Sequence, residues 1–231
     1  MISEGEFREN LQRLRDRVAE ACSFANRKVE DVQILPVTKN WPVSAIHYAQ
    51  NAGFSRVGEN RVQEALGKFE DVSDMNWDLI GHLQSNKAKL VAGAFSRVQT
   101  VDSLKLLNKL NDALKRAGKE IGIFIQVNTG EDPAKSGIFE DECEKLIEQA
   151  LGCSNIRTEG LMTIAPYAPQ DPFVARDAFS RLRLLRDRMV QQFNISLNEL
   201  SMGMTGDLKE AVLEGSTMIR VGSALFGERT Y

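Results

Sequence analysis

Eight short apolar runs recur along the 231-residue chain and alternate with longer segments of helical pattern. The intervening segments, at 43–52, 60–70, 103–117, 139–150 and 172–192, are long enough for the crossover helices that parallel strands require. Eight such units predict a (β/α)8 TIM barrel of the α/β class. The expected strands are QILPVT (33–38), FSRVG (54–58), WDLIG (77–81), FSRVQT (95–100), IGIFIQV (121–127), RTEGLM (157–162), NELSM (198–202) and TMIRVG (217–222).

An additional N-terminal helix is expected over residues 5–25, where apolar side chains recur every three or four positions. An open doubly wound sheet is the competing architecture, but no GxGxxG turn follows an early strand to support a dinucleotide-binding version. No linker-like or low-complexity tract interrupts the chain. We therefore expect one barrel domain over residues 1–231. Because the proline at position 36 removes a ladder donor, we also expect a bulge beside Lys39.

The charge and cysteine content exclude several classes of partner and site. A net charge of −3 and a pI near 5.6 give no general attraction to nucleic acid or to anionic membranes. The three cysteines are odd in number and lack CxxC spacing, so neither a disulfide framework nor a zinc cluster is predicted. The polar, acidic start does not resemble a secretory signal, and no membrane-spanning run follows. We expect a cytoplasmic monomer.

In a β/α barrel, functional side chains collect where the strands end, at the carboxyl-terminal face. Lys39 directly follows the first expected strand. Burial there would lower the pKa of its amine and free it to attack a carbonyl group. An ordinary lysine whose stem packs on the rim is the alternative, so Lys39 needs a second observation. Other polar residues at strand ends are Asn60, His82, Asn128, Thr163, Ser201 and Arg220.

The second observation is a set of candidate phosphate ligands after the last two strands. RVGSALFG (220–227) ends a strand in Gly222 and Ser223 before a short helical turn. Phosphate sites at this place are common in barrels. Ser201 and Thr205 in SMGMTGD would add donors from the seventh strand. The alternative is a strand-to-helix turn in which Thr205 or Asp207 caps the helix. We assign Asp207 to that role, with Glu210 completing a capping box.

Several dispersed segments together resemble the pyridoxal 5′-phosphate (PLP) homeostasis protein family, which is related to the barrel domain of alanine racemase. The resemblance spans nearly the whole chain. It is carried by VTK around Lys39, VGENRVQE (57–64), IGHLQSNK (80–87), EGLMTIAP (159–166), SMGMTGDLKEAV (201–212) and GSTMIRVGSALFGER (215–229).

The resemblance implies PLP in imine linkage to Lys39, with its pyridine nitrogen facing Arg220. It also implies a phosphate group bound by Ser201, Gly222 and Ser223. Asn60, Met162 and Thr205 complete the expected cofactor-binding set, with no metal and no catalytic residue assigned. Two positions depart from the family, where Thr205 replaces a common serine and Asp78 replaces a common histidine.

Arginine at the pyridine nitrogen argues against transaminase chemistry, because arginine acts only as a hydrogen-bond donor and leaves the ring a weak electron sink. The leading enzymatic alternative is a PLP-dependent amino-acid racemase with weak activity. Racemisation needs acid/base groups on both faces of the imine, and the short segment from Arg220 to Tyr231 leaves no room for the second racemase domain. A hydrolase or metal enzyme is disfavoured by the lack of GxSxG and HExxH motifs.

The function expected from the resemblance is intracellular PLP (vitamin B6) homeostasis without enzymatic turnover, which would affect amino-acid metabolism. PLP-dependent apoenzymes or a regulatory protein are candidate partners, and the sequence does not distinguish between them. The basic run RLRLLRDR (181–188) is expected to be a solvated helix packed on the barrel, because Leu182, Leu185 and Met189 share one face.

Overall fold

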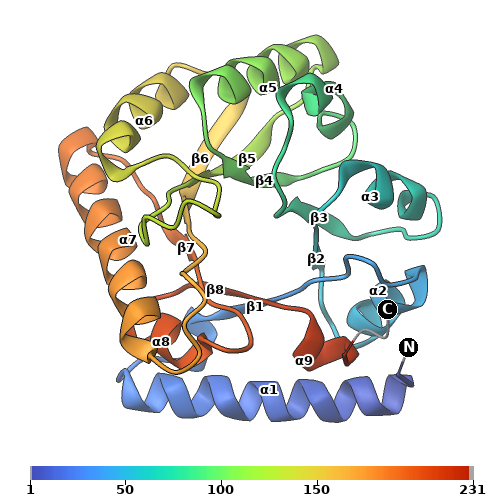
Figure 1. The fold of residues 1–231 in the computed structure, drawn as a ribbon. Helices are drawn as coiled ribbons and strands as arrows, with labels where there is room; N and C mark the ends of the chain where they lie inside the picture. Colours follow the sequence, from blue (N-terminus) through green and yellow to red (C-terminus); the bar gives the residue numbers. More distant parts are fainter. Residues whose placement is uncertain (1, 229–231) are drawn as a thin grey trace.

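The computed structural model describes residues 2–228 and is an eight-stranded parallel barrel surrounded by helices (Figure 1). Residue 1 and residues 229–231 lie outside the described part, including the end of the 215–229 motif and Tyr231. The predicted (β/α)8 fold is confirmed. The strands are β1 (Gln33–Pro36), β2 (Arg56–Glu59), β3 (Asn76–Leu79), β4 (Arg97–Val101), β5 (Ile121–Gln126), β6 (Ile156–Met162), β7 (Glu199–Ser201) and β8 (Met218–Val221).

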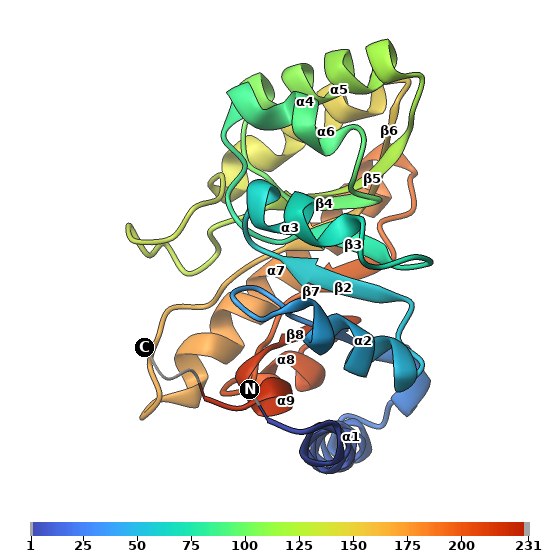
Figure 2. The same cartoon turned by 90° about the vertical axis from the view of Figure 1, so that its right-hand side faces the viewer.

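Helices separate consecutive strands as the sequence pattern predicts, and they form the outer layer seen from the side in Figure 2. The five expected crossover helices are α2, α3, α5, α6 and α7. The helices are α1 (Glu4–Phe24), α2 (Val43–Asn51), α3 (Val62–Phe69), α4 (Ala88–Val91), α5 (Leu104–Ala117), α6 (Cys143–Leu151), α7 (Pro172–Phe193), α8 (Leu208–Leu213) and α9 (Ser223–Phe226), with short 3-10 turns η1 (Val29–Asp31), η2 (Ser85–Lys87) and η3 (Glu140–Glu142).

The bulge predicted beside Lys39, as a way to accommodate Pro36, is wrong. β1 pairs with β8 in unbroken register along its whole length. The amide groups of Gln33 and Val37 donate toward β8, so the nitrogen of Pro36 faces β2 because donor direction alternates along a strand. Among the described residues, a single bridge joins this part of the chain to β2, between Val37, which directly follows β1, and Gly58. Proline therefore lies at the seam where the barrel closes, and no bulge is needed to accommodate it.

The predicted N-terminal helix is α1, which lies along the outside of the barrel beside α8 and α9 (Figure 1). Ser3 and Glu6 form a reciprocal capping box at its start, which satisfies two of the amide groups that a helix leaves unpaired. Its buried stripe includes Phe7, which stacks on Phe226 of α9 with ring centroids 5.2 Å apart. The first and last helices of the chain are thereby packed together.

Two regions hold the buried side chains. The larger apolar core lies between the strands and the helices, and it includes Leu182, Leu185 and Met189 of α7, as the pattern of that helix predicts. A smaller cluster occupies the barrel interior: Leu35, Val37, Ile80, Phe124, Met162 and Met218. Polar and charged residues fill the rest of the interior, including Asp78, Gln99, Ser201 and Arg220.

No helix among residues 2–228 is long and apolar enough to cross a membrane. Cys22, Cys143 and Cys153 are free thiols, as expected from their number and spacing. In the described part of the chain, no cluster of three or more histidine, cysteine and acidic side chains could hold a metal ion.

Candidate functional site

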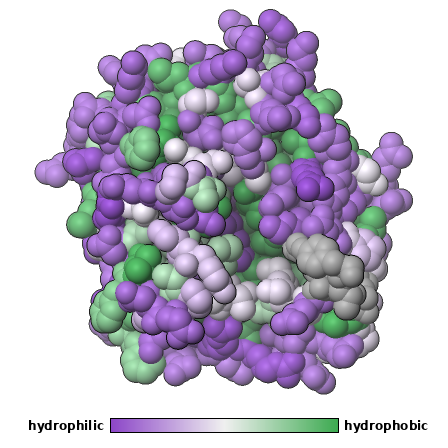
Figure 3. All heavy atoms as spheres, in the orientation of Figure 1, coloured by the Kyte–Doolittle hydropathy of each residue, from purple (hydrophilic) through white to green (hydrophobic). Residues whose placement is uncertain are grey.

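A cavity of about 590 Å³ opens at the carboxyl ends of the strands. The space-filling view of this face shows hydrophobic residues exposed in a central hollow with a largely hydrophilic surround (Figure 3). Residues from the ends of β1, β2, β3, β6, β7 and β8 form its wall. They are Val37, Lys39, Asn60, Ile80, Ile164, Met204, Thr205, Gly206, Arg220, Gly222, Ser223 and Glu228.

Six of the eight predicted cofactor-binding residues line this cavity, namely Lys39, Asn60, Thr205, Arg220, Gly222 and Ser223. Met162 and Ser201 do not line it. Both are fully buried, Met162 in the apolar cluster of the barrel interior and Ser201 in a polar network beneath the cavity floor. The cavity also contains Ile80, Ile164 and Met204, which the site prediction omitted because it considered mainly polar residues at strand ends.

A buried charge cluster holds the chain on the amino-terminal side of Lys39. The Thr38 hydroxyl donates to Oε1 of Glu59 at 2.7 Å. The Lys68 ammonium donates to the same carboxylate oxygen at 2.8 Å and to the Thr38 carbonyl at 3.0 Å. Burial raises the pKa of the Glu59 carboxyl, while Lys68 and Thr38 oppose the shift. The segment before Lys39 is therefore fixed to β2 and α3 through ionic as well as backbone contacts.

The same cluster holds the residue after Lys39. Asn40 has a φ of +60°, and its amide donates to Oε1 of Glu64. Lys68 binds that oxygen as well, at 2.9 Å. Asparagine tolerates this left-handed conformation better than most residues. Glu59 and Glu64 both belong to the VGENRVQE segment, so the structure gives part of that segment a defined task, which is to fix the turn that carries Lys39.

Arg220 is almost completely buried at the cavity floor. Its guanidinium donates to the Ser201 hydroxyl at 2.8 Å and to the Thr163 carbonyl at 2.9 Å. Both of these partners are uncharged. Burial lowers the pKa of Arg220 to about 10, with Asp207 opposing the shift, so the side chain stays cationic at neutral pH. A buried cation with neutral partners favours an anionic ligand in the cavity above it.

The loop between β7 and α8 is held in place by side chains on either side of it. Arg17 of α1 donates to the Thr205 carbonyl at 2.8 Å. Asp207 precedes α8, but its carboxylate accepts from the Met204 amide at 2.6 Å and forms no cap hydrogen bond to the helix. The predicted capping role of the Asp207 side chain, with its capping box to Glu210, is therefore wrong. The carboxylate instead closes the loop that forms one wall of the cavity.

Gly81 allows two strand ends to meet at the rim. A Cβ atom on Gly81 would lie 2.2 Å from the carbonyl oxygen of Asn60, a contact that no side chain can make. The IGHLQSNK and VGENRVQE segments are in direct contact at this point. The closeness of β2 and β3 here places Asn60 and Ile80 on the same cavity wall.

Two other polar residues at strand ends do not line the cavity. His82 is exposed and its Nδ1 lies 3.2 Å from a carboxylate oxygen of Asp102. Asn128 exchanges hydrogen bonds with the backbone of Asp132 at 2.9 and 3.2 Å and closes the loop after β5. The expectation that His82 carries no catalysis remains a prediction.

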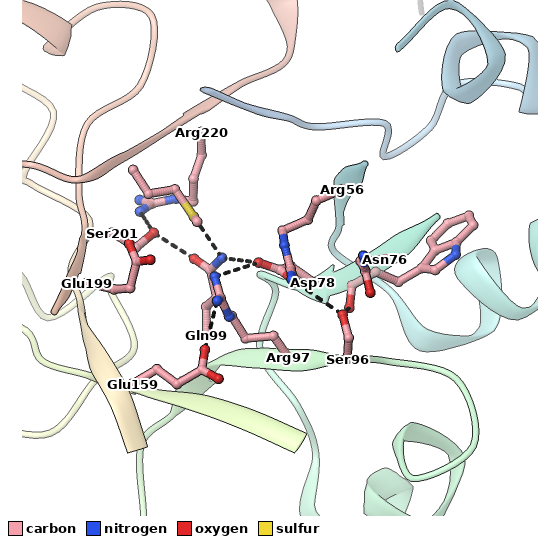
Figure 4. A network of polar contacts seen from close by, with 12 residues as sticks. Arg56, Asn76, Asp78, Ser96, Arg97, Gln99, Glu159, Glu199, Ser201 and Arg220 are labelled. Atoms are coloured by element: carbon pink, nitrogen blue, oxygen red, sulfur yellow. Dashed lines mark hydrogen bonds and ion pairs between the residues drawn. The ribbon is translucent and has the colours of Figure 1, made fainter. Parts of the chain in front are cut away.

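A polar network runs through the barrel interior below Arg220 (Figure 4). Ser201 of β7 donates to Oε1 of Gln99 on β4 at 2.6 Å, and Nε2 of Gln99 donates to Asp78 of β3 at 2.6 Å. Arg56 and Arg97 form ion pairs with Asp78, the latter at 3.7 Å. Burial raises the pKa of the Asp78 carboxyl, and the two arginines oppose the shift. Sequence reasoning missed Gln99 entirely, because no strand-end position or motif marked it.

Comparisons of the sequence and of the fold with known proteins point to the same family. The model of the alanine racemase N-terminal domain matches residues 2–230. The chain is 38% identical to a protein of Aquifex aeolicus named pyridoxal phosphate homeostasis protein, over 96% of this chain and 98% of that protein. A protein of the same name from Pseudomonas aeruginosa is 37% identical over 96% of both chains.

Solved structures agree with this relationship. PipY of Synechococcus elongatus, solved with PLP bound, superposes with a TM-score of 0.80 at 35% identity, covering 91% of this chain and all of PipY. Alanine racemase of Clostridium difficile shares only the fold, with a TM-score of 0.81 at 14% identity and 58% of its length covered. The full-length matches show that this chain belongs to the pyridoxal phosphate homeostasis protein family.

Proposed function

We propose that this protein binds PLP reversibly as an imine on Lys39 and serves intracellular PLP homeostasis. The observation that carries the proposal is that one cavity combines Lys39 and Arg220 with Thr205, Gly222 and Ser223. The relatives' name and the PLP-bound structure of PipY support the same assignment. We place this function in the cytoplasm, where the three free thiols suit a reducing environment.

The cavity residues fit the chemical groups of PLP. A volume of about 590 Å³ is within the usual range for cofactor pockets. A lysine amine condenses with the aldehyde, and a buried arginine donates to an unprotonated pyridine nitrogen. Hydroxyl and backbone donors of Thr205, Gly222 and Ser223 would hold the phosphate group. The negative charge of PLP would also compensate the buried cation of Arg220.

Cofactor storage and delivery fit this cavity better than racemisation. Among the described cavity-lining residues, Glu228 is the only carboxylate, and it is exposed at the rim. Two-base racemisation requires positioned acid/base groups on opposite faces of the imine. We therefore propose a binding protein without a catalytic second base, with weak racemisation as the alternative. Transfer to PLP-dependent apoenzymes or a regulatory protein is part of this proposal, as is a monomeric state.

The test is to record the visible absorbance of the purified protein with PLP, reduce it with borohydride and map the labelled peptide by mass spectrometry. Lys39→Ala should abolish the reducible imine band at this site, whereas the exposed Lys105→Ala on α5 should retain it. A wild-type protein that forms no imine, or a label that remains at its full level in Lys39→Ala, would overturn the proposal. Measuring the interconversion of L- and D-amino acids in the same preparations tests the racemase alternative.

A further inference from the structure

The hydrogen bonds between Arg220 and Asp78 form a chain with a single possible direction. Arginine can only donate, and a carboxylate can only accept. The amide nitrogen of Gln99 must therefore face Asp78 at 2.6 Å, which leaves its Oε1 to accept from Ser201. The Ser201 oxygen accepts from Arg220 at 2.8 Å, so its one proton is committed to Gln99. Every donor in the chain points from Arg220 toward Asp78 (Figure 4).

Asp78 is a suitable anchor for this chain because it is held from several sides. Arg56 and Arg97 lie against it, and Arg97 is itself paired with Glu159 at 2.7 Å. Gln99 also contacts the sulfur of Met218 at 3.2 Å, which packs its amide in one orientation. The side chains of Asp78, Gln99 and Ser201 are completely buried. Water therefore has little access to replace any hydrogen-bonding partner in this chain of hydrogen bonds.

The hydrogen-bond chain limits which groups the Ser201 hydroxyl can bind. Its proton is already donated to Gln99, so donation to a phosphate oxygen would require that hydrogen bond to break. Ser201 also lies beneath the cavity floor and not on its wall. The arrangement therefore favours a role for Ser201 in orienting Arg220, whose long side chain otherwise has considerable rotational freedom. The hydrogen bond from Arg220 to the Thr163 carbonyl fixes only one of the two terminal nitrogens of the guanidinium.

We propose that Gln99, acting through Ser201, is a positioning residue for Arg220, and that it fixes the guanidinium where it donates to the pyridine nitrogen of bound PLP. This inference rests on the proposed function. It assigns Ser201 to arginine orientation in place of phosphate binding, and it gives Asp78 the task of setting the direction of the hydrogen-bond chain.

The test uses Gln99→Met, which keeps the length of the side chain and removes both of its polar ends. Ser201→Ala is a second variant that removes a single oxygen, in case the first folds poorly. Thr100→Val is the matched control, because Thr100 is the next residue of β4 and its buried hydroxyl donates to the Gly81 carbonyl at 2.8 Å, outside the chain. Each protein is loaded with PLP carrying nitrogen-15 in the ring, and its nitrogen NMR signal is followed against pH.

In the wild type, the ring-nitrogen signal should not change with pH, because an arginine donor keeps that nitrogen unprotonated. In Gln99→Met and Ser201→Ala, the signal should move and begin to titrate, and the dissociation constant of PLP should rise roughly fivefold, the equivalent of one neutral hydrogen bond. Thr100→Val should match the wild type. Loss of stability alone would lower occupancy without moving the signal.

If Gln99→Met and Ser201→Ala both give the wild-type signal, unchanged with pH, the positioning assignment is overturned while PLP binding remains intact. A wild-type protein that fails to form the imine would instead refute the proposed function. The two failures are distinguished by the visible absorbance of the wild type.

Discussion

Replacing Lys68 with methionine tests how the turn carrying Lys39 is held. The ammonium of Lys68 makes three short contacts, to Glu59, Glu64 and the Thr38 carbonyl. Its side chain is 10% exposed and that of Glu59 is fully buried. Methionine keeps most of the aliphatic volume and removes the charge. The variant therefore leaves the Glu59 carboxylate buried without its counter-charge.

The expected cost follows from this burial. Removing one partner of a buried ion pair costs about 3–5 kcal/mol of folding stability. The lower end of this range applies here, because Glu64 is 21% exposed and can be rehydrated. For a chain of this length, about 3 kcal/mol corresponds to a fall in melting temperature of roughly 6–12 °C. The exposed Lys105→Met is the control, with a change within about 0.5 kcal/mol.

The stability deficit of Lys68→Met should depend on pH with a definite sign. Burial already raises the pKa of Glu59 in the folded protein, and Lys68 opposes that shift, so removing Lys68 raises the pKa further. Between the unfolded and the folded pKa the native state binds more protons, and stability falls as pH rises through that window. The deficit of Lys68→Met should therefore be larger at pH 8 than at pH 5.

The assay is urea unfolding of the wild type and Lys68→Met at several pH values. Adding Glu59→Gln to Lys68→Met should restore at least about 1 kcal/mol, because the amide carries no buried charge and can still accept from Thr38. A deficit below about 1 kcal/mol at pH 7, or one that grows as the pH is lowered, would refute the reasoning.

Two further predictions concern packing and thiol exposure. Gly81→Ala should destabilise the protein by about 1–3 kcal/mol, because its Cβ would meet the Asn60 carbonyl oxygen at 2.2 Å; a wild-type urea midpoint would contradict this. In native alkylation at pH 8, the partly exposed Cys153 should react first, while Cys143, which is fully buried with its pKa raised to about 12, should react only on unfolding. Peptide mass spectrometry measures both, and equal rates would contradict the prediction.

The barrel was predictable because each of its units carries a local signal. A short apolar run predicts a buried strand, and a segment with three-to-four spacing predicts the helix that covers it. Pro36 shows the limit of such reasoning. The residue type indicates a missing donor, but whether that donor faces a neighbouring strand or the barrel seam depends on pairing, which the local sequence does not contain.

The sequence alone determined which residues gather at the mouth, since Lys39, Asn60, Arg220, Gly222 and Ser223 each lie near or just after the end of an apolar run, and parallel strands place such positions at one end. Only the tertiary structure decided what lies beneath them. Gln99 and Ser201 are 102 positions apart in sequence, and their contact depends on the stagger of strands around the closed barrel. Alternation along a strand fixes which face a side chain takes, but closure decides which side chains from distant strands share a layer.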